Sequence, residues 1–185
     1  MEVLLFAGSL QVGSLNKKLL RIVKKYLEDK KIKHTLIDLL DFAMPVYNQD
    51  IEKSTGIPAT VQKLAEYIKD VEAIIIASPE YNGTISSPLK NTVDWLSRCK
   101  PMPLTDKQLL LLSTSPSQFG GVRGVWHTRV PFEMLGVHMY PTMFSLERGN
   151  MQFNEKGLLI DITVEKRLKK LIDAFIVHIQ KFEKI

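Results

Sequence analysis

A short polar turn near the N-terminus carries residue types suited to binding an anion. Ser9, Gln11, Ser14, Leu15 and Asn16 lie in a stretch that supplies hydroxyl and amide groups and contains no acidic side chain. Free backbone N–H groups and the positive end of a helix dipole attract negative charge at such a turn. The turn is therefore a candidate anion site. The alternative is that Ser14 and Asn16 merely cap the helix that follows.

Two further polar loops carry groups that suit a flat, polar ligand. In the first, Pro79, Glu80, Tyr81, Asn82 and Gly83 place an aromatic ring and an amide directly after an apolar run. The alternative interpretation of this segment is a plain turn, because Asn-Gly pairs favour turns on their own.

The third loop, residues 113–121, is rich in serine and glycine. Ser115 offers a hydroxyl donor, and Gly120 and Gly121 permit close approach of a planar ring edge.

The elements that must position these loops alternate regularly along the chain. Apolar runs predict strands at residues 3–7, 34–40, 73–77, 108–112 and 137–146. Apolar residues at intervals of three and four predict helices from residue 14, over 59–70, from Pro88, over 122–135 and over 164–182. Residues 41–58 predict an irregular connection, since Pro and Gly interrupt the pattern.

Strands that alternate with helices predict an α/β fold in one domain covering residues 1–185. We expect a flavodoxin-like, doubly wound sheet of five parallel strands in the order 2-1-3-4-5, with helices on both faces. In that order the three polar loops follow strands one, three and four. They converge on one crevice at the carboxyl ends of the strands, where ligands of such sheets bind.

The charge and the cysteine content limit the partners and the cellular compartment that we expect. The formal net charge is +5, and much of the basic excess lies at residues 17–33 and 166–170, where helical spacing predicts solvated helix faces. We therefore expect no nucleic-acid partner. A single cysteine, Cys99, and the lack of any apolar run long enough for a membrane span predict a soluble, cytoplasmic protein with no membrane partner. The four histidines show no metal-ligand spacing with one another or with Cys99, so no metal site is expected.

Taken together, the motifs resemble the NADPH-dependent FMN reductase family, which includes quinone, chromate and azo-dye reductases. The resemblance spans about residues 3–144. The quoted motifs are Gly8-Ser9 with Ser14 and Asn16, Pro79-Glu80-Tyr81-Asn82 with Leu89-Lys90-Asn91 and Asp94-Trp95, and Gly120-Gly121. The combination of the second loop with its Leu-Lys-Asn helix is the specific part.

The resemblance implies a bound FMN and the co-substrate NADPH or NADH. The phosphate of FMN would lie in the turn at residues 9–16. Its ribityl chain and ring would lie along residues 79–83, and the polar edge of the ring would lie at residues 115–121. Hydride would pass from NAD(P)H to the flavin and then, in a ping-pong exchange, to a quinone, free flavin, azo dye or metal oxyanion. No protein acid or base is required, because the flavin carries the chemistry. The resemblance also implies a homodimer or homotetramer.

Two departures from the family pattern concern the loops. Gln11 stands where the family commonly has arginine, so the phosphate would meet a neutral donor in place of a cation. Ser86-Ser87-Pro88 replaces a Pro-Gly pair that often precedes the Leu-Lys-Asn run.

Two other functions remain as alternatives. A flavodoxin-type electron carrier would pass electrons to a protein partner, but such carriers are acidic, whereas this chain has a pI of about 9.2. A binding module for anionic ligands or nucleic acid, without redox chemistry, rests only on the lysines. Arg123 and Arg129 are candidates for the 2′-phosphate of NADPH.

Overall fold

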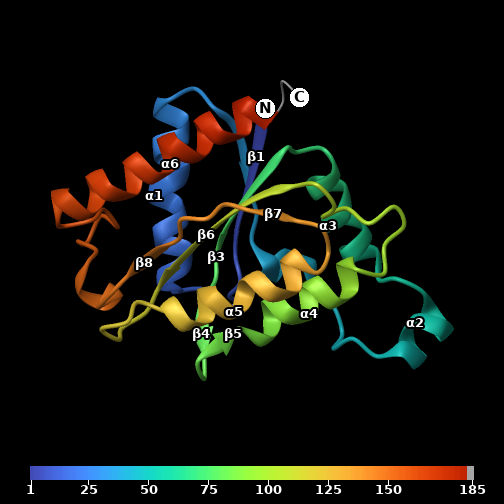
Figure 1. Ribbon diagram of the computed structural model, residues 1–185. Helices are drawn as coiled ribbons and strands as arrows, with labels where there is room; N and C mark the ends of the chain where they lie inside the picture. Colours follow the sequence, from blue (N-terminus) through green and yellow to red (C-terminus); the bar gives the residue numbers. More distant parts are fainter. Residues whose placement is uncertain (183–185) are drawn as a thin grey trace.

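The computed structural model of the protein describes residues 1–182, in which helices cover both faces of a twisted sheet (Figure 1). The main sheet has six strands, β1 (Glu2–Ala7), β2 (Lys33–Leu36), β3 (Ala73–Ala77), β6 (Gln108–Thr114), β7 (His138–Met139) and β8 (Phe144–Leu146). The α-helices are α1 (Leu15–Asp29), α2 (Gln49–Thr55), α3 (Ala59–Lys69), α4 (Ser87–Leu96), α5 (Val122–Glu133) and α6 (Ile162–Phe182). A hairpin of β4 (Glu80–Tyr81) and β5 (Thr84–Ile85) and two 3-10 helices, η1 (Leu39–Phe42) and η2 (Gly149–Met151), complete the described elements.

The main sheet has the order β2-β1-β3-β6-β7, and every pairing in it is parallel. The predicted doubly wound topology is confirmed. The register places Ala7 beside Ala77 and Ala77 beside Leu112, so β1, β3 and β6 end at the same level of the sheet. The loops that follow these three strands therefore begin as neighbours.

The prediction of one fifth strand over residues 137–146 is wrong. β7 and β8 are two short strands, and both pair with β6 at different levels. Pro141 lies between them and has no N–H group to donate to a strand ladder, which accounts for the break.

The second predicted strand and the connection after it also differ from the structure. β2 stops at Leu36, and Asp38 then accepts a hydrogen bond from the N–H of Leu40 and begins η1. Within the predicted irregular connection, α2 forms between Asn48, whose side chain caps its first turn, and Gly56, which has a positive φ of 76°. Both corrections come from local capping that the apolar pattern does not reveal.

Two apolar layers fix the helices on the sheet. α1 and α6 pack on one face through residues such as Leu19 and Phe175, while α3, α4 and α5 pack on the other through residues such as Leu64, Trp95 and Phe132. In Figure 1 the first layer lies on the upper left of the sheet and the second on the lower right. Because both faces are covered, β3 and β6 are buried along their whole length. A ligand can therefore reach these strands only at their ends, and the three polar loops follow the carboxyl ends.

Candidate functional site

The three predicted loops meet at the carboxyl edge of the sheet. The N–H of Gly8 donates to the carbonyl of Ala77 at 2.9 Å, and the N–H of Ser78 donates to the carbonyl of Leu112 at 2.8 Å. A Cβ added to Gly8 would lie 3.0 Å from Leu89 and 3.3 Å from Pro79. The first loop therefore packs against the second with no room for a side chain between them.

The turn between β1 and α1 leaves the start of the helix uncapped. Ser14 occupies the N-cap position, but its side chain makes no capping hydrogen bond. The first N–H groups of a helix have no partner within the helix, so those at Leu15, Asn16 and Lys17 remain available as donors. Ser9 is buried and its hydroxyl accepts from the N–H of Gln11 at 3.3 Å, which curls the turn over the helix end. The capping alternative is therefore wrong for Ser14.

Asn16 has a structural role that its sequence position does not reveal. Its side-chain amide donates to the carbonyl of Thr114 and accepts from the N–H of the same residue, both at 3.0 Å. The side chain is buried and thus joins the start of α1 to the end of β6. The side-chain amide of Asn16 is thus engaged within the protein, and its backbone N–H is one of the helix-start donors without a partner in the helix.

The second loop is a tight hairpin. Asn82 and Gly83 have φ angles of 51° and 79°, the left-handed pair that a two-residue type I′ turn requires. Tyr81, on the outer part of the hairpin, is 41% exposed. The plain-turn interpretation is thus correct for the backbone, and the same turn presents an aromatic side chain at the edge of the site.

Glu80 anchors the hairpin to α5. Its carboxylate accepts from Arg123 at 2.6 Å and 2.9 Å and from the N–H of Gly124 at 3.1 Å. A Cβ added to Gly124 would lie 2.7 Å from the Cα of Glu80, so this close approach requires glycine. Burial acts to raise the pKa of Glu80, but the hydrogen bonds and the charge of Arg123 outweigh burial and lower it from its ordinary value of 4.5. A ligand would meet the backbone of Glu80, since its carboxylate is occupied.

The third loop contains two positions that only glycine can occupy. Gly120 and Gly121 have φ angles of 59° and 84°, and a Cβ on either would overlap neighbouring atoms. Ser115 and Ser117 join their hydroxyls at 2.9 Å, which stiffens the loop. The hydroxyl of Ser113 lies under Gly121 and is the buried side-chain polar atom without a partner in residues 1–182. Ser113 was predicted to lie in the third loop, but it belongs to β6, which extends two residues beyond the predicted strand end.

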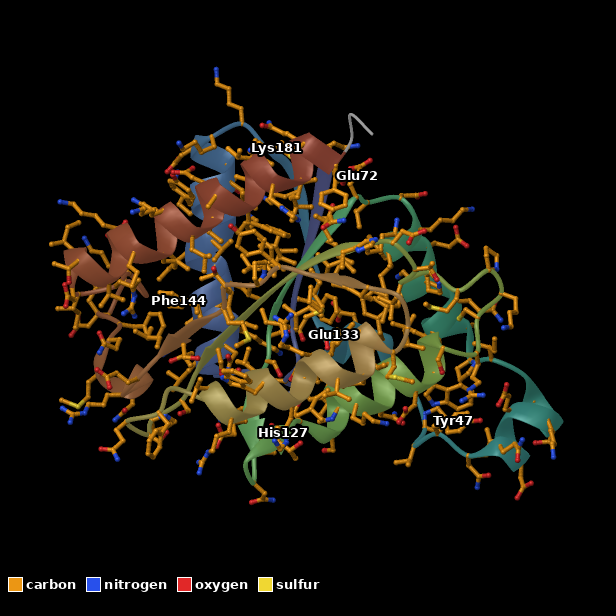
Figure 2. The ribbon with its side chains drawn as sticks, in the orientation of Figure 1. Tyr47, Glu72, His127, Glu133, Phe144 and Lys181 are labelled. Atoms are coloured by element: carbon orange, nitrogen blue, oxygen red, sulfur yellow. The ribbon has the colours of Figure 1, made fainter. Side chains whose placement is uncertain are left out.

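The cations near the crevice mostly have partners within the protein. Lys17 binds Asp38 at 2.7 Å, and Arg129 binds Glu133 at 2.9 Å and the carbonyl of Tyr140 at 3.1 Å. Arg123 binds Glu80 as described. Figure 2 shows His127 of α5 close to the β4–β5 hairpin, where its ring nitrogen lies 3.1 Å from the hydroxyl of Thr84, and Glu133 at the other end of the helix. Neither arginine expected to receive the 2′-phosphate of NADPH is a free cation.

Across residues 1–182, no three His, Cys, Asp or Glu side chains are grouped so as to hold a metal ion. None of the helices in the same range is long and apolar enough to cross a membrane.

Comparison with known proteins identifies the family. A family model described as NADPH-dependent FMN reductase matches residues 1–150. The chain belongs to the NADPH-dependent FMN reductase family. It is thus an oxidoreductase that uses FMN and NAD(P)H, as the resemblance implied.

Individual relatives agree with this placement. The quinone reductase of Escherichia coli K12 is 36% identical over 129 residues, which are 70% of this chain and 68% of that protein. The NADPH:quinone oxidoreductase of Arabidopsis thaliana is 32% identical over 186 residues, covering 97% of this chain and 93% of that one. The solved structure of FerB, a flavoenzyme NAD(P)H:(acceptor) oxidoreductase from Paracoccus denitrificans, superposes with a TM-score of 0.83 at 26% identity and covers 97% of each chain.

The residues present in this family member fit an FMN at the crevice. An uncapped helix start suits the phosphate, and the glycines at 120 and 121 leave room where a Cβ would intrude. The turn at residues 9–16 holds no carboxylate that would repel a phosphate dianion.

The Glu80 anchor predicts a pH-dependent stability. A lowered pKa in the folded state means that the ionised carboxylate stabilises the fold above the unfolded-state pKa, and this contribution is lost as pH falls through the folded-state pKa. We expect Glu80→Gln to lower the free energy of unfolding at neutral pH, with a deficit that shrinks as the pH falls below about 4.5. Urea unfolding at a series of pH values measures this difference.

Glu66→Gln provides the control, because the carboxylate of Glu66 is 70% exposed and lies 3.9 Å from its lysine partner. We expect it to have little effect at any pH. A Glu80→Gln deficit that stayed constant from neutral to acidic pH would contradict the role assigned to the ionised form.

Proposed function

We propose that FMN lies across the three loops at the carboxyl edge of the sheet and that a quinone is the electron acceptor of this reductase. The observation that carries the proposal is the uncapped start of α1 at the end of β1, next to two loops that leave room for a flat ligand. The relatives named as quinone reductases support the choice of acceptor.

The first loop would hold the phosphate. The N–H groups of Leu15, Asn16 and Lys17, the hydroxyl of Ser14 and the amide of Gln11 are its donors. Lys17 adds little charge, because its ammonium is 2.7 Å from Asp38. The phosphate is therefore bound by oriented dipoles and by hydroxyl and amide groups, with no dedicated cation in the turn.

The second and third loops would hold the ring. Backbone groups of Pro79 to Gly83 line one side, and the exposed ring of Tyr81 offers an apolar surface. Gly120 and Gly121 let the backbone approach the polar edge of the ring, where N–H donors stabilise negative charge. The Glu80 anchor keeps the hairpin and the start of α5 at a fixed separation, so the width of the ring site is set in advance.

When bound, FMN supplies the chemistry by accepting hydride from NAD(P)H and giving electrons to the acceptor. The chain's own residues bind, orient and shield the reacting ring. No side chain in the three loops needs to act as an acid or a base, because the flavin carries the chemistry. The carboxylate of Glu80 is occupied by Arg123 and the N–H of Gly124.

Activity with a soluble quinone tests the function. We expect the purified protein with FMN to oxidise NADPH or NADH when a short-chain benzoquinone is added, on the order of 10 turnovers per second. Omission of FMN provides the control. Flavin that binds but gives negligible quinone turnover would contradict the reductase function and favour an electron carrier.

Substitution of Gln11 tests the phosphate position. Gln11→Arg places a cation beside the phosphate and exchanges a neutral hydrogen bond for a charge-assisted one, so we expect FMN affinity to rise roughly 2- to 30-fold. Quenching of FMN fluorescence measures the dissociation constant. Gln49→Arg on α2 is a matched control, because it adds the same charge at an exposed position away from the loops. Equal affinities for both variants would contradict the phosphate position.

We also propose that the reductase is a cytoplasmic homodimer that pairs through α5. Trp126, Val130 and Met134 are 62%, 61% and 80% exposed and follow one another at intervals of four residues, so they form one apolar stripe. The single free thiol, Cys99, fits a reducing compartment.

Val130→Glu is expected to shift the protein to a monomer in sedimentation analysis, and Val177→Glu on α6 is the control. A wild-type monomer at micromolar concentration would contradict pairing.

A further inference from the structure

A small hairpin after β8 projects from the sheet on the α6 side. The N–H of Asn154 donates to the carbonyl of Leu158 at 2.9 Å, and the N–H of Ile160 donates to the carbonyl of Gln152 at 3.0 Å. The side chain of Asn154 closes the turn by accepting from the N–H groups of Lys156 and Leu158, both at 3.0 Å. In Figure 1 this segment is the orange chain that leads into the first turn of α6. Its conformation is therefore defined by its own hydrogen bonds.

The hairpin turns aliphatic side chains toward solvent. Leu159 points inward and is 7% exposed, so its neighbours Leu158 and Ile160 point outward and are 52% and 64% exposed. Ile162, at the start of α6, and Met151, before the hairpin, are 58% and 68% exposed. These four apolar side chains lie within twelve residues, on the hairpin and its two flanks, and the fold leaves them exposed.

Basic side chains surround this patch. A cleft of about 320 Å³ separates α1, the hairpin turn and α6, and Leu158 lies in its lining with cations from all three elements. The cations that line the cleft are Lys18, Arg21, Lys25, Lys156 and Lys169, and the acids are Asp29 and Glu165. Lys166, four residues after Ile162 on α6, is exposed as well. Within residues 1–182, Lys25 and Lys169 pair with acids at 2.7 Å and 2.6 Å, whereas Lys18, Arg21 and Lys156 form no ion pair. The rim thus has unneutralised positive charge.

We propose that Met151, Leu158, Ile160 and Ile162, together with their basic rim, form a docking surface for an anionic phospholipid bilayer. Aliphatic side chains that enter the interfacial region, next to lysines that meet lipid phosphates, are the two components of peripheral membrane binding. This hairpin surface requires no spanning helix. It revises the sequence-based expectation of no membrane partner, which rested on the absence of a long apolar run.

The charge pattern favours a bilayer over other partners. A second copy docked isologously on the same surface would bring one basic rim against another, which is unfavourable. A nucleic acid would use the cations for its phosphates but would leave the four aliphatic side chains unburied. An anionic bilayer satisfies both the charge and the apolar area.

The hairpin surface is connected to the third loop of the site. The N–H of Arg148 donates to the carbonyl of Ser117 at 2.9 Å, and the N–H of Gly149 donates to the carbonyl of Ser115 at 2.8 Å. Docking would therefore bring that loop close to the lipid surface. Delivery of electrons to a lipid-soluble quinone is the consequence that rests on the proposed function, whereas docking itself does not.

Sedimentation with vesicles tests the docking. The purified full chain, without added flavin or NADPH, is mixed with vesicles of phosphatidylcholine alone or with about 30% phosphatidylglycerol, and we expect it to pellet with the anionic vesicles in a salt-sensitive manner. Leu158→Ser with Ile160→Ser is expected to weaken binding about tenfold or more, because two aliphatic contacts are lost. Lys156→Ala and Lys166→Ala are each expected to weaken it about fivefold.

The control variants are Val46→Ser and Lys53→Ala, which change an exposed aliphatic and an exposed cation away from the hairpin. We expect both to bind like wild type. Equal pelleting with neutral and anionic vesicles, or hairpin variants that bind like wild type, would overturn the proposal. A hairpin variant that loses self-association while wild type ignores vesicles would identify the surface as an interface between copies and would also overturn it. None of these outcomes depends on reductase activity.

Discussion

The site depends on one buried amide, the side chain of Asn16, which bonds to both backbone groups of Thr114. The two residues are 98 positions apart and belong to the first and third loops of the crevice. If this amide were absent, the N–H and carbonyl of Thr114 would be buried without partners, at a cost of about 1–3 kcal/mol each. Because the bond fixes the start of α1 against the end of β6, the free N–H groups of the helix lie at a defined distance from the glycines of the third loop.

Charge in this protein is arranged around the crevice more than within it. Lys17 is bound to Asp38, Arg123 to Glu80 and Arg129 to Glu133, so these three cations contribute to the fold. The proposed phosphate contacts are left to helix N–H groups and to neutral side chains. Lys18, Arg21 and Lys156, which form no ion pair within residues 1–182, lie instead beside the hairpin after β8, where they suit a partner much larger than a cofactor.

The sequence was sufficient to predict the doubly wound sheet, the strand order and the convergence of three polar loops, because buried parallel strands and amphipathic helices have distinct periodicities. It was insufficient where a single hydrogen bond or a single proline determines where a strand or a helix begins or ends. Pro141 divides the last strand, and Asn48 caps a helix inside a segment that lacks apolar periodicity.

Hydrogen-bond and ion-pair partners that are distant in sequence could not be predicted either. Asn16 and Glu80 were expected to contact the cofactor, but their side chains bind Thr114 and Arg123. An amide or a carboxylate has the same appearance in a sequence whether its partner is a ligand or the protein itself. The orphaned hydroxyl of Ser113 depends on the close approach of Gly121, which only the folded chain reveals.

The central claim is that the start of α1 binds the phosphate of FMN. The most direct test compares the dissociation constants of FMN and riboflavin, which share the ring and ribityl chain and differ in the phosphate. The account predicts that FMN binds about 100-fold more tightly or better, since at least two charge-assisted hydrogen bonds depend on the phosphate. Equal affinity for the two flavins would contradict it.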